Sequence, residues 1–209
     1  PDTIFTSFFL FALVVPFVAL VAILWAEILI FVPSVARYRE DYFLARLERA
    51  QIASLTLLAD GMVTPELEAE LLKNAGVFNV VLRRDEVRQL ILSSPIPLPI
   101  AETFDMRDPP AWVLIRDALM RLWDTEEQVV RVIGNPVQDG GLLIEITLPT
   151  QPLRMALIDY GLRILVLSAV ISIVTAGLLF LAVRVFLVKP IKGVVDHMQS
   201  YAKAPEDAR

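Results

Sequence analysis

Two long apolar stretches, with a region of mixed polar and apolar positions between them, set the pattern of this chain. The first stretch covers residues 4–31, and the second covers residues 164–183, which contain no charged side chain. A helix of about 20 apolar residues is long enough to cross the hydrocarbon core of a bilayer. The pattern therefore predicts an integral membrane protein with transmembrane helices in residues 1–31 and 161–188.

A signal peptide is the alternative interpretation of the first stretch. Its apolar run is longer than the roughly 7–15 residues of a signal peptide, and signal peptides also carry a cleavage site of small residues. No such site follows this stretch. We therefore predict a retained helix, in which Pro16 removes a backbone donor and favours a kink. Because the chain begins with Pro1, we expect a short basic leader to precede it.

Residues 32–160 predict one domain built of helices and strands. A helix is expected over residues 37–60, continuous with the first membrane helix, and a second over residues 65–75, between a Thr-Pro-Glu start and a Gly stop. Residues 77–82 and 87–92 predict a β-hairpin, and residues 128–133 and 142–148 predict two more strands. The first helix is expected to pack through Tyr38, Tyr42, Ala45, Ile52, Leu55 and Ala59.

The proline-rich segment 93–110 has a different character. Its five prolines predict an extended segment that is not a central strand, and loops of this length are often lids or binding loops. Its last three residues, Asp-Pro-Pro, predict the start of a third helix, whose packed face would hold Trp112, Ile115, Leu119, Leu122 and Trp123. The predicted fold class is α+β, with a four-stranded antiparallel sheet and a helical face.

Charge predicts the orientation. Arg184, Lys189 and Lys192 follow the second stretch, and the positive-inside rule places such residues in the cytoplasm. Four arginines also follow the first stretch, but they belong to a loop of about 130 residues, and the rule counts mainly loops shorter than about 60. We therefore expect residues 32–160 outside the cytoplasm and both termini inside.

Composition excludes several kinds of chemistry. The chain has no cysteine and one histidine, His197, which argues against disulfides, thiol catalysis and an imidazole metal cluster. No basic patch with interleaved aromatic residues is present, so nucleic-acid binding is not expected. No arrangement of catalytic residues is visible, and we predict no catalytic residue, no metal site and no cofactor within residues 1–209.

Two groups of charged residues are candidates for ligand binding. Arg83, Arg84, Arg88 and Arg116, with Trp112, would bind an anionic ligand through bidentate contacts, and the alternative is that these arginines are solvated on a hairpin surface. We place the expected pocket between the sheet, the segment 93–110 and the Trp112 end of the third helix. The acidic run 124–127 would suit a divalent cation, or form a solvated loop.

The second apolar stretch carries small residues at helical spacing, Ser168, Ser172 and Ala176, with Gly177 beside them. Small residues allow close approach of membrane helices, although such a stripe also arises by chance. Glu27 lies near the outer end of the first stretch and Arg163 near that of the second. An ion pair between them is one hypothesis, and an interfacial glutamate without this partner is the other.

Beyond the second stretch, Pro190 starts a predicted helix with a seam of Ile191, Val194, Met198 and Tyr201. Lys-Pro-Ile directly after a membrane helix resembles the opening of a HAMP linker domain, a parallel dimeric four-helix bundle, whose second helix would lie beyond residue 209. The preceding order of helices and hairpins resembles periplasmic PAS-like (PDC or Cache-like) sensor domains.

Together these features resemble the input half of a bacterial, alphaproteobacterial-like, two-component sensor histidine kinase. The resemblance implies a homodimer in the inner membrane that responds to a periplasmic small molecule or ion. It also implies a kinase core beyond residue 209 that uses ATP and Mg²⁺ and phosphorylates a response regulator. His197 lies inside the HAMP-like helix, so we do not expect it to be the phosphoacceptor. The alternatives are the input half of a chemoreceptor or cyclic-dinucleotide enzyme, and a membrane accessory protein without signalling.

Overall fold

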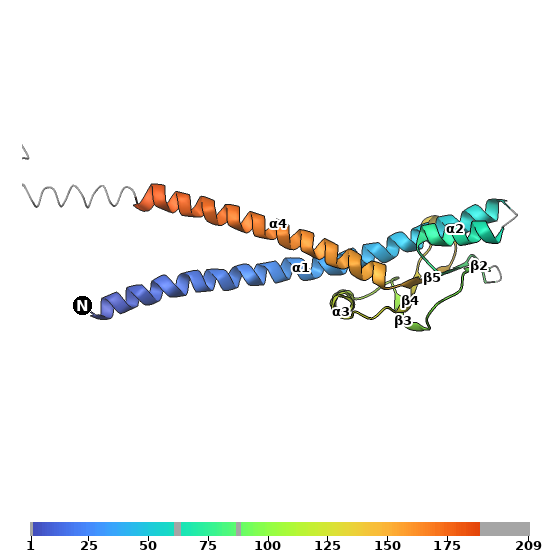
Figure 1. Ribbon diagram of the computed structural model, residues 1–209, viewed down its shortest axis with the longest axis horizontal. Coiled ribbons are helices and arrows are strands. Elements are labelled where there is room, and N and C mark those ends of the chain that lie inside the picture. The colour runs from blue at the N-terminus through green and yellow to red at the C-terminus, as the bar shows by residue number, and fades with distance from the viewer. Residues whose placement is uncertain (1, 61–63, 87–88, 189–209) are drawn as a thin grey trace, which may run out of the picture. The chain divides into compact units, whose positions relative to one another are not determined.

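The computed structural model describes residues 2–60, 64–86 and 89–188 (Figure 1). The helices are α1 (Asp2–Asp60), α2 (Pro65–Ala75), α3 (Ala111–Trp123) and α4 (Gln151–Val183), with a short 3-10 turn η1 (Val137–Asp139) and a π-helical turn η2 (Arg184–Val188). The strands are β1 (Asn79–Arg83), β2 (Gln89–Ser93), β3 (Ile100–Asp105), β4 (Val129–Gly134) and β5 (Leu143–Pro149). The described residues fall into two compact units, with the boundary between Leu162 and Arg163.

The five strands form one sheet in the order β2-β1-β5-β4-β3. β1 pairs with both β2 and β5 in antiparallel register, and β4 pairs with β5 in the same way. Each of the four predicted strands is present, with its bounds moved by one or two residues. The predicted α+β class is therefore confirmed.

The predicted four-stranded antiparallel sheet is wrong, because the proline-rich segment contributes a fifth strand. β3 lies at the edge of the sheet and runs parallel to β4. The prolines flank this strand and leave residues 100–105 free to donate backbone hydrogen bonds. Parallel neighbours need a crossover connection rather than a tight turn, and α3 lies between the two strands in the chain.

The second half of α1 packs only partly through the predicted face, of which Tyr38 and Tyr42 lie against the core. Its buried residues include Val35, Arg39, Phe43, Leu47, Ala50 and Ser54. Two residues of the predicted face, Ile52 and Leu55, are exposed instead. The observed stripe contacts core side chains that alternate along β1, β4 and β5. The prediction missed the centre of the packed face because it followed apolar residues and passed over a stripe that contains an arginine and a serine.

α2 and α3 differ in how well the sequence predicted them. In α2 the Thr64 side chain accepts a hydrogen bond from the backbone N–H of Leu67, and Gly76 ends the helix in the left-handed conformation at φ 70°. Both termini are confirmed. In α3 the predicted packed face is wrong at its two tryptophans, since Trp112 and Trp123 are exposed, whereas Ala118 and Arg121 are buried.

Two described helical segments, Val21–Thr56 and Gln151–Phe186, are long and apolar enough to cross a membrane. From Val35 onward one face of α1 is buried in the α+β unit, so the preceding part of this helix is its candidate membrane segment. The helix is unbroken at Pro16 and at Pro33. α4 is also continuous, with no break between Tyr160 and Ile164.

α1 and α4 meet at two contacts inside the first unit. The rings of Tyr38 and Tyr160 stack with their centroids 4.2 Å apart and their planes 13° apart. At the next residue of α4, a Cβ added to Gly161 would lie 3.2 Å from the ring of Phe31, which stands two helical turns before Tyr38. The glycine therefore allows a close approach of the two helices, and the tyrosine pair joins them where they enter the α+β domain.

Candidate ligand-binding cavity

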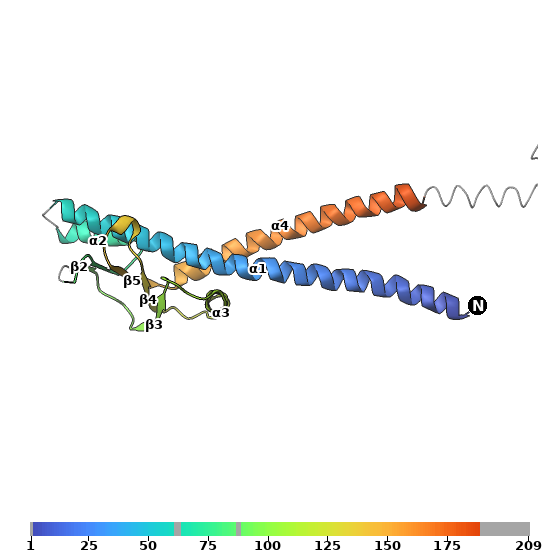
Figure 2. The same ribbon diagram turned by 180° about the vertical axis from the view of Figure 1, so that it is seen from behind.

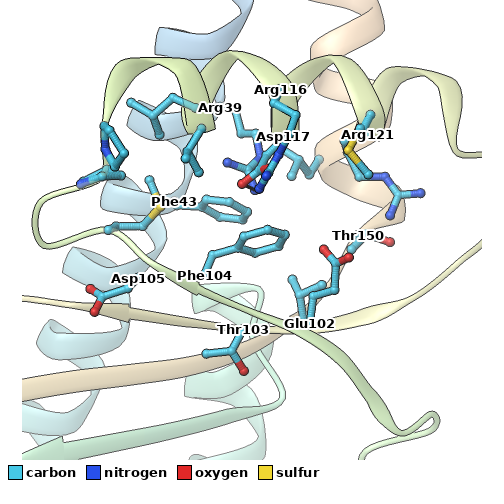
Figure 3. A pocket seen from close by; sticks show the side chains of 18 of the residues that line it. Arg39, Phe43, Glu102, Thr103, Phe104, Asp105, Arg116, Asp117, Arg121 and Thr150 are labelled. Carbon is cyan, nitrogen blue, oxygen red and sulfur yellow. Dashed lines mark hydrogen bonds and ion pairs between the residues drawn. The ribbon is translucent and has the colours of Figure 1, made fainter.

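A cavity of about 920 Å³ lies between α1, β3, α3 and the start of α4 (Figure 3). α1 contributes Arg39 and Phe43, and α4 contributes Leu153. The cavity is therefore walled in part by the two helices that carry the apolar stretches. The lining also includes Glu102, Phe104, Asp105, Met106, Arg107, Leu114, Arg116, Asp117, Arg121, Asp124 and Val130.

Arg39 is the most deeply buried charged group of the cavity, with 2% of its surface exposed. Its Cζ atom lies 4.8 Å from the ring centre of Phe43 and 4.3 Å from that of Phe104. Phe43 stands one helical turn beyond Arg39, and the two phenyl rings stack at 6.0 Å (Figure 3). Aromatic faces attract a guanidinium ion and hold its plane, so this arginine is fixed by packing rather than by hydrogen bonds.

The charge of Arg39 is incompletely compensated. Its closest carboxylate oxygen in the described part of the chain is Asp117 Oδ2, 3.9 Å from Nη2. Its Nε atom is buried and has no hydrogen-bond partner in the structure. Burial lowers the pKa of Arg39 to about 10, although Asp117 and Glu102 act in the opposite direction. The guanidinium is thus still protonated at neutral pH, and a buried donor is left unused.

The other arginines around the cavity have closer partners, although Arg121 Nε is also buried without one among the described residues. Arg116 donates from Nε to Asp117 Oδ1 at 2.9 Å. Arg121 donates from Nη2 to the backbone carbonyls of Asp124 and Glu126, at 2.8 and 2.9 Å. It therefore closes the loop that follows α3. Arg107 is exposed at the rim, and its hydrogen bonds to Asp105 lower the pKa of that carboxyl.

The edge strand places one carboxylate on the cavity side. Glu102 and Phe104 alternate along β3 and share a face, and in Figure 3 the Glu102 carboxylate points toward α3, whereas Asp105 points away. Glu102 is exposed and acts on Arg39 through space. The cavity thus combines one buried guanidinium, whose Nε has no partner in the described part of the chain, with an exposed carboxylate.

The predicted ligand-binding residues are only partly brought together. Arg116 lines the cavity, and its guanidinium lies 5.2 Å from the ring of Trp112, which is exposed on α3. Arg83 and Arg84 are exposed at the end of β1, on the hairpin side of the sheet, and Arg88 lies outside the described residues. The expected pocket position, between the sheet, the segment 93–110 and α3, agrees with the cavity.

The remaining candidates lie elsewhere. Ser168, Ser172, Ala176 and Gly177 are all in α4, and a Cβ added to Gly177 would have nothing within 4 Å. Glu27 is in α1 and Arg163 in α4, and their pairing stays a prediction. Pro190, Ile191, Val194, Met198 and Tyr201 lie outside the described residues.

The acidic run 124–127 has a local structural role. Asp124 accepts hydrogen bonds from the backbone N–H of Glu126 and from the Gln128 side chain. The described residues contain no group of three or more His, Cys, Asp or Glu side chains placed to hold a metal ion.

Arg39 is the residue that the sequence interpretation missed. A signal was present, because Val35, Arg39, Phe43 and Leu47 recur every four residues and thus share one face of a helix. A charged residue inside an apolar stripe is a candidate for a buried functional group. The comparisons with known proteins add no assignment, since no family model, no curated protein and no solved structure matches this chain.

Proposed function

We propose that this chain is the sensing and transmitting half of a bacterial two-component sensor histidine kinase, with its α+β domain in the periplasm. The observation that carries the proposal is the shared wall of the cavity, to which α1 contributes Arg39 and Phe43 and α4 contributes Leu153. Both helices continue into stretches apolar enough to cross a membrane. A small molecule in the cavity would contact both helices at once.

The path from the cavity toward the membrane is short. Leu153 is fully buried and lies two turns before Tyr160, which stacks on Tyr38, the neighbour of Arg39. Because α4 has no break in this region, a displacement or rotation at Leu153 is carried along the helix. Packed helix interfaces tend to hold discrete arrangements, so a small shift can select between two output states. The HAMP-like residues after the second apolar stretch would receive that shift in a homodimer.

The transmission is tested by fusing residues 1–209 in frame to the kinase core of a HAMP-containing sensor and measuring autophosphorylation in reconstituted membranes. Tyr160→Leu removes the ring stack, and Pro190→Ala alters the start of the HAMP-like helix. We expect each to change the phosphorylation level several-fold, while Met155→Leu, on the exposed side of α4, leaves it unchanged. Unchanged phosphorylation in both test variants, with normal membrane insertion, contradicts the proposal.

The membrane arrangement has its own test, because the chain has no cysteine. Thr125→Cys introduces an exposed thiol in the α+β domain, and Lys203→Cys introduces one beyond the second apolar stretch. In intact spheroplasts a membrane-impermeant maleimide should label only the former, and permeabilisation should expose the latter. Labelling of both positions, or of neither, before permeabilisation would overturn the two-helix arrangement.

A further inference from the structure

We propose that the cavity binds a small organic monocarboxylate with an apolar body, and that Arg39 is its anchoring residue. This inference rests on the proposed function only for its biological role. The binding site itself follows from the geometry of α1, β3 and α3.

The unused hydrogen-bonding capacity of Arg39 points to an anion. Its guanidinium lies at the cavity wall, is almost completely buried, and has an Nε atom without a partner. An unsatisfied buried donor lowers stability unless something binds it. The nearest carboxylate oxygen, 3.9 Å away on Asp117, is beyond hydrogen-bond distance. A ligand carboxylate of the right reach would supply the missing contact.

The charges around Arg39 favour one negative charge rather than two. The cavity arginines Arg107, Arg116 and Arg121 each have a carboxylate of the chain closer than the one 3.9 Å from Arg39. Arg121 Nε is also buried without a partner, but Arg39 is the one of the four whose charge has no carboxylate oxygen of the described residues at hydrogen-bond distance. Glu102 and Asp117 already act on Arg39, and they would repel a second negative charge. A planar carboxylate also matches the fork of a guanidinium group, with two parallel hydrogen bonds.

The rest of the wall is suited to an apolar group. Phe43 and Phe104 both pack against Arg39, and the same cavity is lined by Met106, Leu114, Val130 and Leu153. Small-molecule sites are typically apolar cavities in which a few polar groups fix the orientation of the ligand. The apolar body would lie against these side chains, in contact with α4 through Leu153.

The inference is tested on the full 209-residue chain in lipid nanodiscs. The probes are phenylacetate, benzoate and hexanoate, each compared with its neutral amide, together with inorganic phosphate. We expect at least one carboxylate to raise the melting temperature in a concentration-dependent way, with its amide and phosphate inactive. Absence of a shift with all three carboxylates, or an equal shift with an amide or with phosphate, would overturn the inference.

Two variants identify Arg39 as the anchor. Arg39→Gln should weaken carboxylate binding by about tenfold to a hundredfold, the range expected for a lost charge-assisted hydrogen bond. Arg131→Gln is the matched control, because Arg131 lies between Val130 and Val132 on β4 and so faces the other side of the sheet. Equal affinities in these two variants would contradict the assignment.

A second variant is expected to strengthen carboxylate binding, which loss of folding could not do. Asp117→Asn removes the chain's own competing carboxylate, so the bound carboxylate should raise the melting temperature by more than in the unmodified chain. A structural role for Arg39 alone predicts no such gain, and its absence counts against the site. In the kinase fusion, carboxylate binding without a change in phosphorylation would refute the proposed function and leave the site intact. A change in phosphorylation without carboxylate binding would refute the site and leave the proposed function standing.

Discussion

Arginines lie near both edges of the sheet, at the β1–β2 hairpin and at β3, and their surroundings differ. At the β1–β2 hairpin, Arg83 and Arg84 are exposed to solvent. At the β3 side, Arg39 is buried against two phenyl rings and keeps a donor without a partner. The hairpin arginines form the denser cluster in the sequence, but Arg83 and Arg84 do not line the cavity. Burial and neighbours, rather than clustering along the chain, make an arginine a candidate anchor.

Figure 2 shows the two regions from behind, with the β2 side and the α3 side at different ends of the sheet. The hairpin side is closed by α2, whose Glu68 carboxylate accepts a hydrogen bond from the backbone N–H of Ser93. The cavity side is closed by α3 over the edge strand. Variants at the cavity should therefore change stability and carboxylate binding more than variants at the hairpin.

The largest contrast is expected for apolar truncation. Phe43→Ala removes a fully buried ring that packs on Arg39 and Phe104, and should lower the free energy of unfolding by about 3–5 kcal/mol. Ile91→Ala, at an exposed position of the hairpin, should change it by less than about 1 kcal/mol. Denaturant titration followed by tryptophan fluorescence measures both, and similar losses would show that the cavity side is no better packed.

The second contrast concerns the buried charge. Asp117→Asn leaves Arg39 without its nearest carboxylate and should cost about 3 kcal/mol. The double variant Arg39→Met with Asp117→Leu replaces both charges by apolar side chains and should recover most of that stability. It should nevertheless bind none of the carboxylates. A stable double variant that still binds phenylacetate would separate the cavity from the anchor and contradict our assignment.

A smaller effect is expected at Arg121. Its two hydrogen bonds to backbone carbonyls tie the loop after α3 to the helix, so Arg121→Met should cost about 2 kcal/mol and leave the carboxylate specificity unchanged. Denaturant titration gives the first quantity and the nanodisc melting assay gives the second. A changed preference between phenylacetate and its amide would mean that Arg121 also contacts the ligand.

The smallest effect is expected at the hairpin. Arg84→Gln replaces an exposed residue and should change the free energy of unfolding by no more than about 0.5 kcal/mol. Carboxylate affinity should also be unchanged, as measured by the melting shift in nanodiscs. A loss of affinity comparable with that of Arg39→Gln would restore the hairpin arginines as the binding site and remove the contrast.

The sequence predicted the positions of the helices and strands better than which of their faces are buried. Capping by Thr64 and Gly76 is a local property of the backbone, so the ends of α2 were predicted correctly. The edge strand β3 was missed because its prolines marked the whole segment as a loop, although they occupy only its flanks. The burial of Arg39 and the exposure of Trp112 went against hydrophobicity, and both depend on how α3 packs across α1.

The amino-acid sequence by itself determined two apolar helices of membrane-spanning length and an α+β domain between them, since length, periodicity and capping act within a few residues of one another. Only the tertiary structure decided that α3 connects parallel strands, and that Arg39, Phe104 and Asp117 meet at one cavity. These residues are far apart in the chain, and no local pattern encodes their meeting. Whether a buried charge is compensated depends on the side chains that the fold brings around it.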